Sequence, residues 1–205
     1  METLTNNKIS CAIGWTGKGN TIMTNELNVV IGSWGSYNAC NDRAQGSKWI
    51  NLADYTDWDE ITVELKSQGF MLKGIDEELF IQDIEGLPSG CTNWDYMHPK
   101  TLFDTLYRSG VLEDNHKYDI MIAFLEVRSY DEFEELVSSK GYHWDDDIRL
   151  YSNYDWEDYG REMFDCYGYN VDERLLNFFD FEAYGQYIGS DFAQEYDGGI
   201  IEILT

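Results

Sequence analysis

Residues 144–166 read WDDDIRLYSNYDWEDYGREMFDC, and this stretch decides what we expect of the whole chain. It contains eight carboxylates, opposed only by Arg149 and Arg161, and six aromatic residues are interleaved with them: Trp144, Tyr151, Tyr154, Trp156, Tyr159 and Phe164. Acidic runs with few aromatics stay disordered because they cannot bury enough apolar surface to offset chain entropy. The aromatics here supply that surface. The pattern therefore predicts a folded segment that displays fixed negative charge; a solvated acidic face without a partner is the plainer alternative.

The second half of this stretch predicts a helix that is N-capped by Asp155 and runs to about Cys166, with Gly168 ending it. Spacings of three, four and three residues place four acids on one helical face: Asp155, Asp158, Glu162 and Asp165. Like charges at such spacings destabilise an isolated helix by a few tenths of a kcal/mol each. A sequence that keeps them over three turns indicates that the charge is used.

Negative charge accumulates toward the end of the chain. The 205 residues carry a formal net charge of −25, and residues 143–205 hold sixteen acids and three bases, or −13 of that total. A field of this sign repels nucleic acid and membrane phosphates and attracts basic grooves. A halophilic origin is the alternative, but it predicts acids spread evenly along the chain.

Nothing in the sequence predicts a metal, a cofactor or a membrane span. The four cysteines are scattered without a CxxC pair, and the three histidines do not cluster with them. The GWTGKGNT run departs from a phosphate-binding loop because Gly19 follows Lys18. The start of the chain is polar, and no apolar run approaches the ~20 residues of a membrane span. We therefore expect a protein of the reducing cytoplasm with free thiols.

The first part of the chain predicts a small α+β unit. Residues 1–26 are interpreted as an N-terminal extension, and residues 27–87 as the first domain. Within it we expect a strand at 28–33, a Gly/Asn/Ser-rich loop at 34–47, a strand at 48–52, a helix capped by Thr56 and a strand at 78–84.

Residues 88–142 predict a helical domain. Pro99 opens a helix that Gly110 ends, residues 118–127 form a second helix, and Ser129 with Glu132 forms a capping box that starts a third. Residues 143–205 predict an acidic α+β domain. There we expect a strand at 148–151, a helix from Asp172 through Phe179, and a hairpin of residues 192–195 and 200–204 around Asp197-Gly198. The fold class is thus α+β, with three small domains and an acidic surface.

Four motifs occur in an order that resembles the ArdA antirestriction proteins. They are the NVVIGSWGSYNACNDRAQGSKWINL stretch with its Gly35-Ser36-Tyr37-Asn38 loop, the FIQD run at 80–83, the FDFEAYG run at 179–185, and the closing acidic hairpin. The resemblance covers about residues 27–205. The chain departs from the family at Gln186-Tyr187, where the usual pattern is Arg-Asp.

The resemblance implies three small domains in a row that make an elongated, curved and strongly acidic molecule, which dimerises through the C-terminal domain. It also implies mimicry of B-form DNA, with the protein filling the DNA-binding groove of a type I restriction-modification enzyme and blocking restriction and modification. The expected partner is the methyltransferase core, with no nucleic acid bound. An acidic binding module that sequesters another basic DNA-binding protein is the alternative.

An enzyme is the rival class, and we expect none. Glycosidases use two carboxylates about 5–10 Å apart, but among 39 acids some pair will satisfy that spacing by chance. His98, His116 and His143 lie near polar segment starts, and no Ser-His-Asp arrangement is visible. We expect no catalytic residue.

The predicted site is therefore a distributed surface of carboxylates that stand in for DNA phosphates. Its members are Asp57, Asp59, Glu60, Glu77, Glu78, Glu126, Asp131, Glu134, Glu135, Asp145, Asp146, Asp147, Asp155, Glu157, Asp158, Glu162, Asp165, Asp172 and Glu173. A dimer interface is expected at the aromatic residues Phe178, Phe179, Phe181, Tyr184 and Tyr187, because this segment has more apolar surface than ~60 residues usually bury alone.

Overall fold

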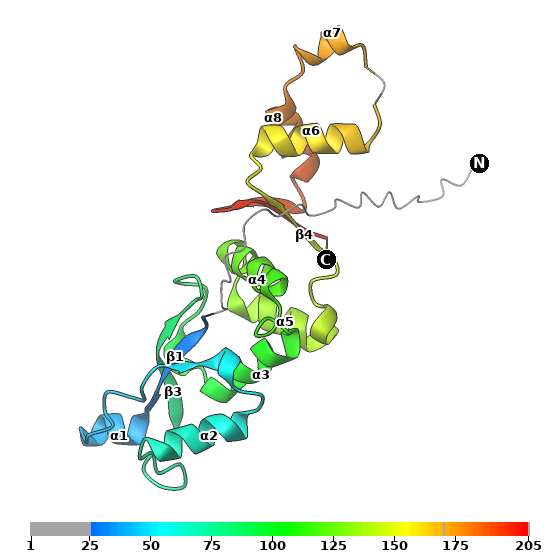
Figure 1. The fold of residues 1–205 in the computed structure, drawn as a ribbon. Helices are drawn as coiled ribbons and strands as arrows, with labels where there is room; N and C mark the ends of the chain where they lie inside the picture. Colours follow the sequence, from blue (N-terminus) through cyan, green and yellow to red (C-terminus); the bar gives the residue numbers. More distant parts are fainter. Residues whose placement is uncertain (1–25, 170, 205) are drawn as a thin grey trace. The chain divides into compact units, whose positions relative to one another are not determined.

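The computed structural model describes residues 26–169 and 171–204, so the predicted extension falls almost wholly outside it (Figure 1). The described residues form eight α-helices and two small antiparallel sheets. They separate into two compact units, residues 26–150 with 203–204 and residues 151–202, and the division falls within the strands of the second sheet. The mixed α+β class is confirmed, while the division into three domains stays a prediction.

The first unit combines a three-stranded sheet with a group of helices. Its elements in chain order are β1 (Asn28–Ser33), α1 (Trp34–Ala39), β2 (Ile50–Asn51), η1 (Leu52–Asp54), α2 (Trp58–Ser67), β3 (Leu79–Glu85), η2 (Trp94–Tyr96), α3 (Pro99–Ser109), α4 (Asn115–Val127), α5 (Tyr130–Lys140) and η3 (Gly141–His143). The sheet order is β2-β1-β3. β1 lies in the middle because its Val and Ile side chains are buried on both faces.

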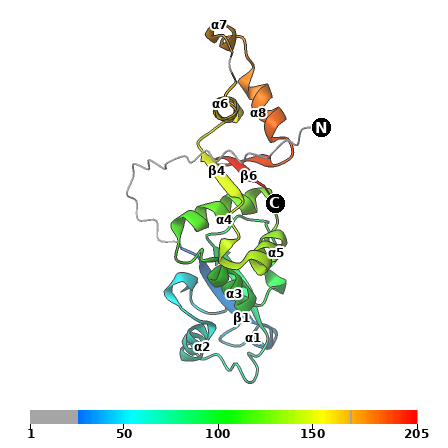
Figure 2. The same ribbon diagram turned by 90° about the vertical axis from the view of Figure 1, so that its right-hand side faces the viewer.

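The helices α3, α4 and α5 gather beside this sheet, as the two views of the ribbon agree (Figures 1 and 2). The capping residues predicted for α3 and α5 are present. Pro99 opens α3, Gly110 ends it in a left-handed conformation at φ 80°, and Ser129 and Glu132 form the capping box of α5. Their core includes Phe103, Phe133 and Trp144, all fully buried. None of the described helices is both long enough and apolar enough to cross a membrane.

The second unit consists of a helix pair next to a three-stranded sheet. Its elements are β4 (Ile148–Ser152), which begins in the first unit, α6 (Trp156–Cys166), α7 (Glu173–Leu176), α8 (Phe181–Gly189), β5 (Ala193–Tyr196) and β6 (Gly199–Ile203). The sheet order is β4-β6-β5, and the predicted hairpin is confirmed, with Tyr196 opposite Gly199. The core contains Tyr151, Tyr159, Ala193 and Ile200.

α6 and α8 cross at two glycines, and this contact holds the second unit together (Figure 1). A Cβ on Gly160 would lie 2.0 Å from the carbonyl oxygen of Phe181, and one on Gly185 would lie 2.3 Å from that of Trp156. No side chain fits at either position, so the backbones of the helices are in direct contact. Phe164 of α6 packs edge-on against Phe181 of α8, with ring centroids 5.5 Å apart.

Four sequence expectations need correction in their extent. Residues 34–47 are not all loop: α1 forms because the Ser33 hydroxyl accepts the N–H of Ser36 and Cys40 ends the helix at φ 47°. The strand expected at 48–52 is only Ile50–Asn51, because Asn51 caps η1. The second helix of the helical part starts earlier, at Asn115, where Asp114 accepts two backbone N–H groups. The helix expected from Asp172 to Phe179 ends at Leu176, since α7 buries no residue that would stabilise a longer helix.

Two further corrections concern a cap and a helix. The N-cap of α2 is Asp57 and not Thr56: the Asp57 carboxylate accepts the N–H of Glu60 at 2.9 Å. The Glu60 carboxylate in turn accepts the N–H of Thr56 at 2.8 Å. The helix α8 was not expected at all. It is capped by Asp180, and its glycines become favourable only through the contact with α6.

Candidate functional site

The carboxylates of α6 are displayed as the helical spacing predicts. The opposite side of the helix is buried at Tyr159, Gly160 and Phe164, which leaves the acidic row facing solvent. Asp155 accepts the N–H of Asp158 at 2.9 Å and so caps the helix while its side chain stays exposed. Asp158 and Asp165 are exposed and Glu162 is half-buried. The aromatics of this stretch provide the core, as expected.

A second group of acids forms the turn before β4. Asp146 and Asp147 are exposed: the carboxylate of Asp146 lies 3.5 Å from Nδ1 of the exposed His143, and that of Asp147 lies 3.1 Å from Nζ of the half-buried Lys140. Asp145 differs, because its carboxylate pairs with the buried ammonium of Lys117. One member of this acidic triplet is thus neutralised inside the protein.

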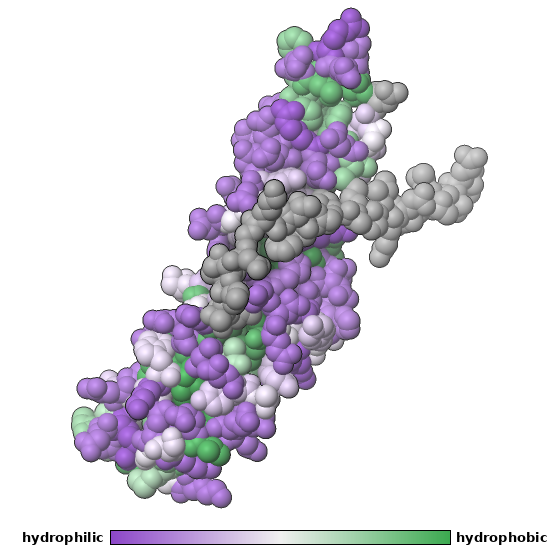
Figure 3. Space-filling model, viewed as in Figure 1, coloured by the Kyte–Doolittle hydropathy of each residue, from purple (hydrophilic) through white to green (hydrophobic). Residues whose placement is uncertain are grey.

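The remaining predicted acids lie on helices and in turns of both units. None of the nineteen predicted carboxylates is buried, and only three are half-buried: Glu134, Asp145 and Glu162. Local hydrogen bonds hold several of them in place; for example, Arg174 donates to Asp172 and holds the pKa of that carboxyl below its usual value. On the face seen in Figure 3, hydrophilic residues cover most of the described surface.

Two acids outside the predicted set are buried, and they serve the fold. Burial alone would raise the pKa of Asp76, but the Ser36 hydroxyl, the Met71 N–H at 2.7 Å and Arg43 at 3.1 Å outweigh it and lower that pKa. Glu202 is buried in the second unit and accepts the hydroxyl of Tyr159 at 2.7 Å. Burial, reinforced by that bond, raises the pKa of Tyr159 well above its ordinary value. Neither acid can serve as an exposed charge.

The predicted interface residues differ in how far they are exposed. Phe178 and Tyr187 are 86% and 78% exposed, whereas Phe181 is 5% exposed and packs on Phe164 and Phe179. Hydrophobic residues are also visible around α7 in Figure 3. The interface itself stays a prediction, and the structure offers Phe178 and Tyr187 as its accessible members.

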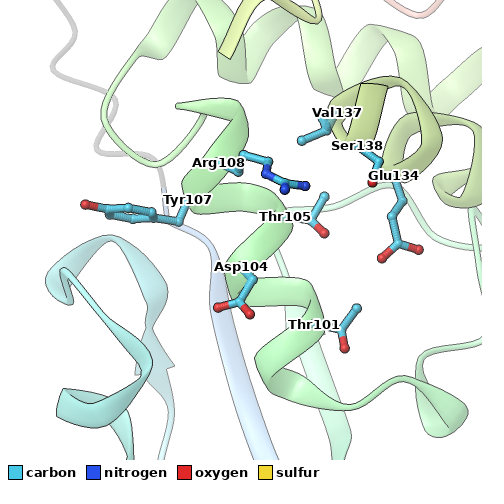
Figure 4. A pocket seen from close by; sticks show the side chains of 8 residues that line it. All are labelled: Thr101, Asp104, Thr105, Tyr107, Arg108, Glu134, Val137 and Ser138. Atoms are coloured by element: carbon cyan, nitrogen blue, oxygen red, sulfur yellow. The ribbon is translucent and has the colours of Figure 1, made fainter. Parts of the chain in front are cut away.

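A shallow pocket of about 450 Å³ lies between α3 and α5 in the first unit (Figure 4). Its lining is mostly polar: Thr101, Asp104, Thr105, Tyr107, Arg108, Glu134, Val137 and Ser138. The carboxylate of Asp104 pairs with Lys100 one turn earlier. The lining includes two carboxylates, Asp104 and Glu134, which is the residue type that the enzyme alternative requires, but among 39 acids such a pair is not specific evidence for catalysis. In the part of the chain that the structure describes, no three His, Cys, Asp or Glu side chains come close enough to hold a metal ion.

The fold and the exposed acids describe a small α+β protein that displays carboxylates on ordered helices and turns. The family model for ArdA, described as an antirestriction protein, matches residues 29–202. The chain therefore belongs to the ArdA family of antirestriction proteins. A search of curated proteins finds no match.

Proposed function

We propose that this protein inhibits type I restriction-modification enzymes by occupying their DNA-binding groove in place of B-form DNA. The observation that carries the proposal is the row of carboxylates on α6, which is ordered by an aromatic core and directed to solvent. Carboxylates fixed in this way present partners to Arg and Lys side chains, as phosphates do, but offer no base to be modified.

The amount of charge fits a DNA site. B-form DNA carries two charges per base pair, so 25 net charges equal those of roughly 12 base pairs and a dimer equals roughly 25. A bipartite recognition site within a larger footprint has that size. The methyltransferase core, which binds the recognition site, is therefore the proposed partner, and both restriction and modification are blocked when it is occupied.

The first test is the salt dependence of binding to the purified methyltransferase. If the carboxylates replace six or more phosphate contacts, the affinity should fall by about a thousandfold or more between 50 and 200 mM salt. Direct binding can be followed by titration calorimetry, and competition with labelled duplex DNA shows whether the same groove is used. An affinity that does not change with salt, or binding that leaves DNA in place, would contradict mimicry.

We propose further that two chains associate through residues 151–202, with Phe178 and Tyr187 at the contact. Replacing both by serine should raise the dimer dissociation constant by about tenfold or more, because exposed aromatics of this size dominate interface energies. Light scattering across micromolar concentrations measures the change. The control is Tyr96→Ser, which removes an equally exposed aromatic from the first unit. A wild-type protein that is monomeric at those concentrations would refute the proposal.

A further inference from the structure

Lys117 is a buried cation in a strongly acidic protein. Its side chain is 8% exposed, and it lies in the first turn of α4, where the helix dipole disfavours positive charge. Burying an ammonium group is costly unless partners replace its water. Here the ammonium pairs with the Asp145 carboxylate, donates to the carbonyl oxygen of Tyr142 at 2.7 Å, and lies 4.2 Å from the centre of the Tyr142 ring.

All of these partners belong to residues 141–147, which we call the acidic turn. A second anchor lies close to the first: Trp144 is fully buried, and its Nε1–H donates to the carbonyl oxygen of Ser109 at 3.1 Å. Gly110 allows the turn to come close, since a Cβ there would lie 2.4 Å from the Tyr142 ring. Lys117 is therefore the charged group through which α4 binds the acidic turn.

The two anchors leave three consecutive carboxylates in two different environments, one paired with Lys117 and two exposed to solvent. Asp145 points to Lys117 and is 15% exposed, while Asp146 and Asp147 are 66% and 55% exposed. Tyr142, Trp144 and Asp145 are held in this way, and Asp146 and Asp147 stay on the exposed side of the turn, beside His143 and Lys140. Without Lys117, the Asp145 carboxylate would have to reach water, and the turn would move with it.

We propose that Lys117 is a positioning residue for inhibition: its ion pair with Asp145 fixes the exposed carboxylates of Asp146 and Asp147 for the partner's basic groove. The inference rests on the proposed function. For the strength of inhibition after Lys117 is replaced, positioning and total charge give opposite predictions. Removing Lys117 changes the net charge from −25 to −26, so mimicry by total charge predicts equal or stronger inhibition, whereas positioning predicts weaker inhibition.

The test compares full-length variants in competition with labelled duplex DNA for a type I methyltransferase. Lys117→Met and Asp145→Asn should each weaken competition about tenfold. The double variant keeps the net charge at −25 and lacks the same ion pair, so it should also weaken competition about tenfold, and not by the product of the two single losses. The binding slope against log salt should fall by about two in Lys117→Met, for the two lost contacts. A smaller folded fraction would lower the affinity and leave that slope unchanged.

A second comparison uses the displayed acids themselves. Asp146→Asn with Asp147→Asn should weaken competition about as much as Lys117→Met, and adding Lys117→Met to this pair should cause no further loss. Lys117→Met that competes as well as wild type, or full additivity in the triple variant, would overturn the inference. If Lys117→Met does not fold by circular dichroism, Asp145→Asn and the double variant decide by the same criteria. A wild-type protein that fails to compete refutes the proposed function itself, and the inference falls with it.

Discussion

Replacing Gly160 by alanine is expected to destabilise residues 151–202 by about 3 kcal/mol or more. In an exposed helix the same change is stabilising by about 1 kcal/mol. Here the new Cβ would lie 2.0 Å from the carbonyl oxygen of Phe181 and 3.0 Å from the backbone nitrogen of Gly185. Ordinary overpacking costs about 1–3 kcal/mol, and backbone atoms cannot move aside as a flexible side chain can. The clash therefore outweighs the gain in helix propensity, and α6 and α8 must separate.

Urea unfolding and amide hydrogen exchange measure this effect. Exchange should accelerate in α6 and α8, while the β1 and β3 amides of the first unit keep their protection. Gly185→Ala should act in the same way, because its Cβ would lie 2.3 Å from the carbonyl oxygen of Trp156. Gly74→Ala is the matched control: the nearest heavy atoms are 3.6 and 3.8 Å from its Cβ, so it should change stability by less than about 0.5 kcal/mol. Equal stability of Gly160→Ala and Gly74→Ala would contradict the packing argument.

The contact between these glycines shows which part of the fold could not be predicted from the sequence. Local chemistry predicted α3, α5 and α6 well from their capping residues, β1 from its apolar run, and the final hairpin from Asp197-Gly198. The helix α8 could not be found in that way, since two glycines and several aromatics give it low propensity and its stability comes from α6. A glycine inside a helical pattern does indicate close packing. Gly160 was such a signal, but its partner at Gly185 is set by tertiary structure.

The acids of the candidate surface also differ in how well the sequence predicts their environment. Helical spacing was enough to predict that Asp158 and Asp165 are exposed, because the period of a helix fixes the side opposite its apolar stripe. It could not predict that Asp145 is neutralised, since Lys117 is 28 residues away in the chain and is brought to it by folding. Asp76 is the converse case. It lies beside Glu77 and Glu78 in an acidic run, yet polar groups distant in sequence hold it in a buried position.

Neutralising all four acids of the α6 row is expected to weaken inhibition by about a hundredfold or more, although each single change is nearly silent. The single variants are Asp155→Asn, Asp158→Asn, Glu162→Gln and Asp165→Asn. One exposed charge in a distributed surface contributes on the order of 1 kcal/mol or less, which is at most about fivefold in affinity. Four contributions of about 0.7 kcal/mol, each about threefold in affinity, add up to about 2.8 kcal/mol, which is about a hundredfold. A general acid or nucleophile behaves in the opposite way, because its loss alone removes orders of magnitude of rate.

The amides keep the shape of each side chain, and the asparagine introduced by Asp155→Asn would still cap the helix, so the comparison isolates charge. The matched control neutralises four exposed acids outside the predicted surface: Asp42→Asn, Asp54→Asn, Glu113→Gln and Asp191→Asn. Competition with labelled DNA for the methyltransferase, at fixed salt, compares the two quadruple variants, which have the same net charge. If both quadruple variants lose affinity to the same extent, total charge alone determines binding, and the position of the acids on α6 does not matter. If a single substitution in the row abolishes inhibition while circular dichroism shows an intact fold, the distributed surface is wrong, and catalysis at that residue becomes the hypothesis to test.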